Sequence, residues 1–249
     1  MKYLLLTLLL LVGRPALADG FDAVEAKLKA ALVADIRTDA EKKRDRNRRP
    51  IATLRFFGLR DDMRIVELIP GAGWYTKLLA PVVQENGEFY AALGTGRISN
   101  WLIKEPGFEH VQIIAADSKI YRNKDDNFYT LETVGLGVVD VDMVLTFRNY
   151  HNFAPMGRAA MNKAAFEALK SGGIYAVVDH TRRHMEADNA ENRRRVDPVL
   201  AIHEIEAAGF EFVDFTDIHF RLDDELRYEV GRKTVTGNTD RWTLKFIKP

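Results

Sequence analysis

The sequence lacks cysteine, an excess of charge of one sign, and any apolar run of the roughly 20 residues that a membrane-spanning helix needs. The absence of cysteine excludes disulfides, thiolate zinc sites, cysteine nucleophiles and a lipidated N-terminal cysteine. Because 36 basic side chains balance 36 acidic ones, no global field attracts nucleic acid, and we expect no nucleic-acid partner. With 249 residues and a hydrophobic fraction of 47%, the chain is long enough to bury a substantial core.

The N-terminus carries an apolar run, "YLLLTLLLLV", which stops at Gly13 and Arg14. A run of about ten residues is typical of the apolar region of a signal peptide. Lys2 precedes the run, and the small residues of "ALA" follow it at positions 16–18. The pattern predicts a signal peptide at residues 1–18, cleaved before Asp19, with an uncleaved membrane anchor as the alternative. We therefore expect a periplasmic or secreted mature protein with no stable membrane insertion.

Residues 19–58 are predicted to form an N-terminal helical extension. Apolar residues recur at helical spacing over Phe21–Ile36, and "TDAE" from Thr38 has the spacing of a capping box that begins a second helix. Pro50 suits the first turn of a third helix, which Gly58 closes. The second helix carries the basic stretch "EKKRDRNRRP". Because acids interleave with its bases, we interpret the stretch as a solvated face; a contact for an anionic partner is the alternative.

After residue 58, strand-like and helix-like segments alternate, which predicts one α/β domain over residues 59–249. This spacing favours a Rossmann-like, mostly parallel sheet of seven strands with helices on both faces. The last two strands lack a helix between them, so we expect an antiparallel C-terminal hairpin joined by a long loop. Strands are predicted at 63–70, 87–94, 110–117, 140–147, 174–180, 210–220 and 241–249, and helices at 74–86, 155–173 and 198–209.

A glycine-containing turn, "ELIPGAGWYTKLLAP", joins the first of these strands to its helix. Ligands of open α/β sheets bind at such turns, where glycine lets the backbone approach a ligand and the helix presents free N–H groups. The turn has the first two glycines of a dinucleotide fingerprint, but Thr76 stands in the third place. Leu93 stands where an acid that holds a ribose is expected. A pyrophosphate-binding dehydrogenase site is therefore poorly supported.

"VELIPGAGWYT" resembles motif I of the class I S-adenosylmethionine-dependent methyltransferases. Glu67 matches the acid of that motif, Gly71 and Gly73 match its two later glycines, and Ile69 replaces its first glycine. The resemblance runs from about Arg49 to the C-terminus, through "DMVLTFRNYHNF", "ALKSGGIYAVVDH" and "IEAAGFEFVD". More closely, the chain resembles a group of predicted exported methyltransferases that share "PGxGWYT", "LTFRNxHN", "VVDH" and a closing "TDRW/F" strand.

The resemblance implies a class I methyltransferase fold and S-adenosylmethionine as cofactor. Its methionine end would lie over the glycine turn, and its adenine near the end of the third strand. The aromatic pair after the second glycine would lie against the sulfonium, or would fill the core instead. Leu93 leaves the ribose contact unassigned. The implied cofactor-binding residues are Glu67, Gly71, Gly73, Trp74, Tyr75 and Asp117.

The fourth-strand motif, "TFRNYHNF", stands where these enzymes place substrate-facing residues. We interpret Arg148 as a contact for an anionic substrate and Asn149 as one for a hydroxyl or amide. His151 is a candidate general base, with a buried structural histidine as the alternative. Asp179 and His180 end the fifth strand and are expected on the pocket rim. The "HTRRH" spacing alone does not predict a metal site, and we expect none.

These features together predict an exported S-adenosylmethionine-dependent methyltransferase that acts on a small molecule. S-adenosylmethionine is made in the cytoplasm, and nothing in the sequence explains its supply outside. The alternative is a non-catalytic periplasmic protein that uses the same fold to bind another ligand. A hydrolase is disfavoured because the chain contains no GxSxG nucleophile elbow. The oligomeric state and the methyl acceptor are not determined by the sequence.

Overall fold

A seven-stranded sheet forms the centre of the computed structural model, which describes residues 20–249. The strand order is β3-β2-β1-β6-β7-β9-β8, and β9 runs antiparallel to both β7 and β8 while the remaining pairs are parallel. The predicted mostly parallel sheet with an antiparallel C-terminal pair is therefore confirmed. Its strands are β1 Arg64–Leu68, β2 Glu88–Ala92, β3 Gln112–Ile114, β6 Val141–Phe147, β7 Leu169–His180, β8 Glu211–Phe215 and β9 Arg241–Ile247.

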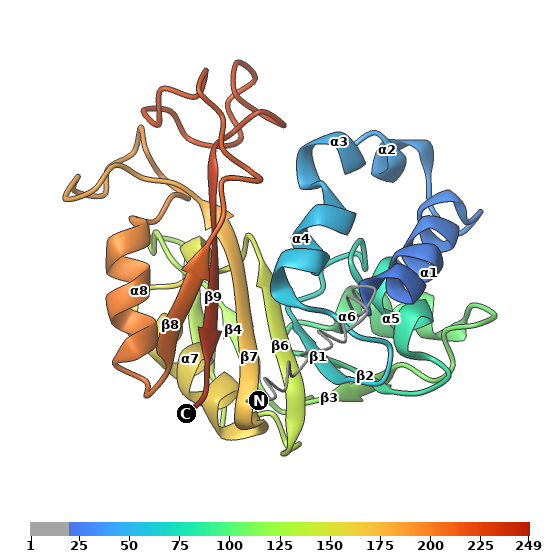
Figure 1. Ribbon diagram of the computed structural model, residues 1–249. Coiled ribbons are helices and arrows are strands. Elements are labelled where there is room, and N and C mark those ends of the chain that lie inside the picture. The colour runs from blue at the N-terminus through green and yellow to red at the C-terminus, as the bar shows by residue number, and fades with distance from the viewer. Residues whose placement is uncertain (1–19) are drawn as a thin grey trace, which may run out of the picture.

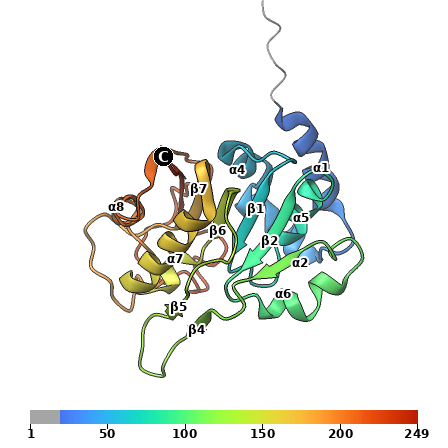
Figure 2. The same ribbon diagram turned by 90° about the horizontal axis from the view of Figure 1, so that it is seen from below.

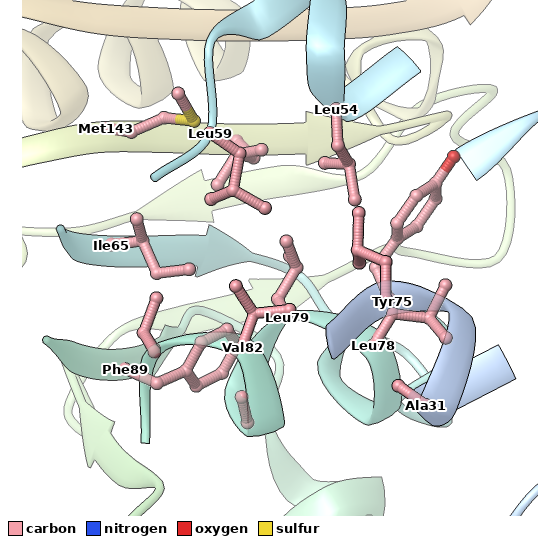
Figure 3. Close-up of a cluster of buried hydrophobic side chains, with 14 of the residues drawn as sticks. Ala31, Leu54, Leu59, Ile65, Tyr75, Leu78, Leu79, Val82, Phe89 and Met143 are labelled. Atoms are coloured by element: carbon pink, nitrogen blue, oxygen red, sulfur yellow. The ribbon is translucent and has the colours of Figure 1, made fainter. Parts of the chain in front are cut away.

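Helices cover both faces of this sheet. Helices α1 (Phe21–Val33), α4 (Pro50–Phe57) and α5 (Thr76–Val83) pack on one face, where Ile65 and Phe89 of the sheet meet α5 (Figure 3). Helices α7 (Pro155–Ala168) and α8 (Pro198–Glu206) pack on the other face. Alternate residues of β1 enter the two clusters because successive side chains of a strand point to opposite faces. Glu67 lies two residues after Ile65 in β1 and so faces α5.

The N-terminal extension differs from the expected three helices in its middle. The predicted second helix is two four-residue helices, α2 (Asp39–Lys42) and α3 (Asp45–Arg48). Thr38 and Glu41 form the predicted capping box of α2. Arg49 has a φ of 40°, and this left-handed residue ends α3 directly before Pro50. A residue before proline is disfavoured in the α-helical conformation, which explains why the second and third helices do not merge.

Two further differences concern segments with weak periodicity. The residues "LKSGG" were expected to continue a helix, but they belong to β7, in which Leu169 pairs with Val141. A two-stranded sheet of β4 (Lys119–Tyr121) and β5 (Thr130–Glu132) was not predicted, nor was α6 (Gly96–Asn100). Figure 2 shows β4 and β5 outside the main sheet, where β5 contacts α7. Three-residue strands are too short to give a pattern with a period of two.

The parallel strands all end at one edge of the sheet, and this edge positions the candidate site. Figure 1 shows α2 and α3 on one side of this edge and the long loop before β9 on the other. The predicted signal peptide lies outside the described residues. Among residues 20–249, no helix is both long and apolar enough to span a bilayer.

Candidate functional site

The glycine turn after β1 takes a conformation that depends on its two glycines. Gly71 and Gly73 have φ values of 60° and 80°, in the left-handed region that side chains disfavour. Open space surrounds the position of a Cβ on Gly71, whereas a Cβ on Gly73 would lie 2.6 Å from Cδ2 of Leu102. Gly73 therefore allows close packing, and Gly71 keeps the backbone accessible.

Replacing each glycine by alanine should separate these two roles. Gly73→Ala is expected to lower the free energy of unfolding by about 2 kcal/mol, because it adds overpacking to an unfavourable φ. Gly71→Ala meets no neighbour and should cost only about 1 kcal/mol of backbone strain. Gly58→Ala is the matched control, since Gly58 also has a positive φ, of 78°, and open space around it. Urea denaturation measures all three; equal losses at Gly71 and Gly73 would contradict this division.

Glu67 lies beneath the turn with only 3% of its surface exposed. The hydroxyl of Thr76, the first residue of α5, donates a hydrogen bond of 2.6 Å to its carboxylate. Burial raises the pKa of Glu67 to about 7, against the opposing effects of the Thr76 hydrogen bond and of the Arg48 charge. The carboxyl group thus changes its charge near neutral pH, unlike an ordinary glutamate.

A cavity of about 230 Å³ opens over the turn, and we call it the turn cavity. Its walls bring together several residues predicted from the sequence: Glu67, Gly71, Trp74, Tyr75, Arg148 and Asn149. The amide of Asn149 donates 3.2 Å to the backbone oxygen of Ile69, so it holds the turn in place. Asp117 is exposed and lines none of the cavities described here, so the structure does not bring it to the predicted site.

The two aromatic residues of the turn already have partners. The guanidinium of Arg48 lies 4.2 Å from the ring centroid of Trp74, and Tyr75 stacks on Phe147 with their centroids 3.5 Å apart. Trp74 also donates through its indole nitrogen to the backbone oxygen of Glu41, at 3.0 Å. Both side chains therefore pack the wall of the turn cavity, which agrees more with the core-filling alternative than with a free aromatic face.

Unusual backbone conformations mark the ends of several parallel strands. Ile69, Leu93, Ala115 and Arg148 follow β1, β2, β3 and β6 directly, and all four have φ values between 53° and 61°. Strain of this kind clusters at functional sites, where the surrounding structure holds it. Leu93 is 1% exposed and belongs to the apolar cluster on the α7 face. A Cβ on Gly94 would lie 3.3 Å from Ile120 of β4, so apolar packing fills the place of the expected ribose-binding acid.

His151 and Asp179 form a buried pair beside the turn cavity. His151 lies in the short 3-10 helix Tyr150–Asn152, and its Nδ1 is 2.5 Å from the Asp179 carboxylate. The same carboxylate accepts the backbone N–H groups of His151, at 2.9 Å, and of His180, at 2.6 Å. Asp179 is 0% exposed, so it lies behind the histidines and not on the pocket rim where it was expected.

His180 does line a cavity, as expected, but its chemistry is that of a neutral imidazole. Its Nδ1 is 2.9 Å from the hydroxyl of Thr239, and its ring centroid is 5.4 Å from that of His151. Burial holds the pKa of His180 well below its usual value, and the neighbouring His151, when it is protonated, acts in the same direction. His180 is therefore a hydrogen-bonding group at this site and carries no positive charge near neutral pH.

A second cavity, of about 350 Å³, adjoins the turn cavity, and we call it the arginine cavity. It shares Arg44, Arg48 and Arg148 with the turn cavity, and its walls also include His151, His180, Arg194 and Arg241. Sequence reasoning missed Arg48 and Arg241. Arg48 lies in the basic stretch interpreted as a solvated face, yet it is 6% exposed. The signal available was its position two residues before Pro50, where the chain turns toward the sheet.

The charged segment before α8 is anchored by a buried ion pair. Arg195 forms two hydrogen bonds with Asp224 in the long loop before β9. His184 contacts Asp197 at 2.9 Å, so it is not paired with His180. Within residues 20–249, no group of three or more histidine, aspartate and glutamate side chains is placed to hold a metal.

Comparison of structures finds proteins with the same fold, whereas comparison of sequences finds no match. The sequence matches no protein-family model and no curated protein. A SAM-dependent methyltransferase from Aquifex aeolicus aligns with 90% of this chain and 98% of its own, with 14% identity and a TM-score of 0.57. The 4+2 cyclase SpnF aligns over 92% and 93%, with 15% identity and a TM-score of 0.54. Human N-acetylserotonin methyltransferase, in complex with SAM, aligns over 92% and 57%, with 12% identity and a TM-score of 0.52. The chain therefore has the class I methyltransferase fold.

Proposed function

We propose that this chain is an exported S-adenosylmethionine-dependent methyltransferase that acts on a small molecule. The observation that carries the proposal is that the two cavities adjoin and share wall residues. The glycine turn with Glu67 opens into one, the His151–Asp179 pair adjoins the other, and Arg48 and Arg148 line both. This arrangement supports a cofactor site in one cavity and a proton-accepting group in the cavity beside it. Because the fold also supports a cyclase, fold alone does not fix the reaction.

The turn fits the amino-acid end of S-adenosylmethionine. Gly71 leaves open space for a close approach, and Glu67 supplies an acceptor for an ammonium group. When bound, the cofactor supplies an electrophilic methyl group. On the ribose side the fit is poorer, because Leu93 and Ile120 offer apolar packing and no carboxylate. We therefore assign the turn to the methionine end and leave the ribose without a polar partner.

The residues of this chain would prepare the methyl acceptor. Asp179 engages Nδ1 of His151, which leaves Nε2 to take a proton from a hydroxyl group in the arginine cavity. The two backbone N–H groups that Asp179 also accepts fix the imidazole in its orientation. Arg148, which lines both cavities, would contact an anionic group of the acceptor.

Calorimetric titration of the mature chain, from Asp19 onward, with S-adenosylmethionine and S-adenosylhomocysteine tests the proposal. We expect micromolar binding that Gly71→Ala weakens by about 10-fold or more, because its Cβ occupies the space of closest approach. Gly58→Ala carries a similar backbone strain at a residue that lines neither cavity, so it should bind like the wild type. A folded wild-type sample that binds neither compound would sink the methyltransferase proposal.

A ligand-binding protein on the same fold is the second candidate. The observation that favours it is the apolar packing of Leu93 with the β4 segment, which fills a place that the fold commonly uses for cofactor. This candidate predicts that the arginine cavity binds its ligand in the absence of S-adenosylmethionine, and that no methyl transfer accompanies binding.

A further inference from the structure

Three arginine side chains from distant parts of the chain converge on the arginine cavity. Arg48 ends α3, Arg148 follows β6, and Arg241 begins β9. Arg48 and Arg241 are 6% and 7% exposed, and the Nε atom of Arg148 is fully buried. Such burial is costly for a guanidinium unless an anion accompanies it.

Within residues 20–249, none of the three forms an ion pair or a hydrogen bond with a carboxylate. The Nε atoms of Arg148 and Arg241 are buried without any partner. Arg241 donates one hydrogen bond, of 2.8 Å, to the backbone oxygen of Asn47, and Arg48 lies over the ring of Trp74. The donors of this cavity are therefore largely unused.

Other buried arginines of this chain are handled differently. Arg37 pairs with Asp45, Arg158 with Glu204, and Arg195 with Asp224 through two hydrogen bonds. Each of these guanidinium groups meets a carboxylate of the chain itself. The contrast indicates that the arginine cavity leaves its cations for a partner that the chain does not provide.

The charges around the cavity indicate how much negative charge the partner carries. The three converging guanidinium groups contribute +3, and buried Asp179, whose charge acts on Arg148 and Arg241, contributes −1, which leaves +2. Two other arginines of the cavity wall add little to this charge: Arg44 is exposed and screened by solvent, and Arg194 is paired with Glu229. His180 stays neutral, and Glu67, near Arg48, is only partly ionised at neutral pH. Burial and, next, the charge of Arg148 lower the pKa of Arg48 to about 8 and that of Arg241 to about 10. A dianion would neutralise the site.

We infer that the arginine cavity binds a small molecule through a dianionic oxyanion group, held by Arg48, Arg148 and Arg241. Guanidinium groups suit this role because their planar, paired donors match phosphate and carboxylate oxygens. The volume of about 350 Å³ is that of a small-molecule pocket and exceeds the needs of a single ion. The inference does not depend on methyl transfer, since it holds for an enzyme and for a binding protein alike.

Two probes, inorganic phosphate and malonate, test the inference on the mature chain at a pH where both are dianions. We expect each probe, but not chloride at matched ionic strength, to raise the unfolding temperature, because binding to the folded state adds RT ln(1 + [L]/Kd) to the free energy of unfolding. Tighter binding of phosphate would identify a phosphate-bearing ligand, and tighter binding of malonate a dicarboxylate. Either result supports the dianion site. No stabilisation by either probe would overturn it.

Arginine variants distinguish binding at this cavity from nonspecific attraction of an anion to the positive charge of the surface. Arg48→Gln, Arg148→Gln and Arg241→Gln should each weaken binding of the preferred probe by about 10-fold or more, as expected for a charge-assisted hydrogen bond. Arg46→Gln is the matched control, because Arg46 lies in the same helix, α3, but is exposed and outside the cavity. Equal weakening by Arg46→Gln would overturn the inference.

The free energy of unfolding without ligand is a second measurement, and it shows whether a variant has lost binding because its fold is damaged. Because the three cations are unpaired, Arg148→Gln should leave the unliganded protein as stable as the wild type or more so. A strong loss of stability would show that Arg148 serves the fold and would count against the inference. Parallel titration with S-adenosylmethionine separates the two proposals: binding of the cofactor without the dianion defeats only this inference, and the reverse defeats only the methyltransferase.

Discussion

Asp179→Asn is expected to lower the free energy of unfolding by about 3–5 kcal/mol, among the largest effects of any single substitution in this chain. The wild-type carboxylate is fully buried and accepts three hydrogen bonds, from Nδ1 of His151 and from the backbone N–H groups of His151 and His180. Asparagine replaces one acceptor oxygen by an N–H₂ group, which would face donors. It also removes the negative charge that acts on Arg148 and Arg241. Urea denaturation with a fitted m value measures the loss.

The same substitution should strengthen dianion binding while it weakens the fold. Without Asp179 the net charge assigned to the arginine cavity rises from +2 to +3, so phosphate or malonate should bind more tightly to the molecules that remain folded. The proposed methyl transfer should slow, because His151 loses the group that orients it. Asp142→Asn serves as the control, since Asp142 contacts Arg64 and Lys170 at the start of β6, away from the cavities. An equal loss of stability in both variants would contradict a special role for Asp179.

The sheet was predictable because its strands carry strong local signals. β1 and β6 are largely apolar and almost wholly buried, as strands covered on both faces require, and each is followed by a turn or a helix start. The missing helix between β8 and β9 correctly predicted their antiparallel pairing. The glycine turn was equally readable, since Gly71 and Gly73 both take the positive φ that glycine permits.

The charged half of the site was not predictable in the same way. Arg48 and Arg241 lie 193 positions apart in the sequence, and only the tertiary fold brings both to one cavity. The pattern of "EKKRDRNRRP" is that of a solvated helix, and the one local signal that separates buried Arg48 from exposed Arg46 is its position two residues before Pro50. The burial of Arg48 depends on the left-handed conformation of Arg49 before Pro50, which breaks the helix and places α3 at the carboxyl edge of the sheet.

Asp179 and Leu93 illustrate a second limit of sequence reasoning. Both positions were recognised as belonging to the ends of strands, but the direction of a side chain at a strand end depends on backbone angles that sequence does not reveal. Leu93, with a φ of 61°, packs into the apolar cluster, and Asp179 lies beneath the cavity behind two histidines. The sequence therefore indicated where the site lies, but not what Leu93 and Asp179 do in it.

Glu67→Gln is expected to make the protein more stable above neutral pH, by about 3 kcal/mol. The pKa of Glu67 is about 7 in the folded state and 4.5 for an exposed glutamate, and each pH unit of this difference corresponds to about 1.4 kcal/mol. A raised pKa means that the folded state favours the protonated carboxyl group. Its contribution to stability is therefore fully present below pH 4.5 and is lost as the pH rises through 7. Glutamine keeps an oxygen that accepts the Thr76 hydrogen bond and carries no charge, so the variant should not show this loss.

The measurement is the difference in unfolding free energy between variant and wild type, followed from pH 4.5 to above 7. The difference removes the effect of other groups such as His219, whose pKa burial lowers to about 4 and whose contribution falls as the pH is lowered. Glu41→Gln is the control from the same cavity: the pKa of Glu41 is lowered by its contact with Lys77 despite partial burial, so this variant should lose stability at neutral pH. A stability difference between Glu67→Gln and wild type that does not change with pH would contradict the raised pKa of Glu67.

If the ammonium group of S-adenosylmethionine contacts Glu67, as proposed, the ligand should lower the pKa of Glu67 and move the transition to lower pH, because a nearby cation favours the carboxylate.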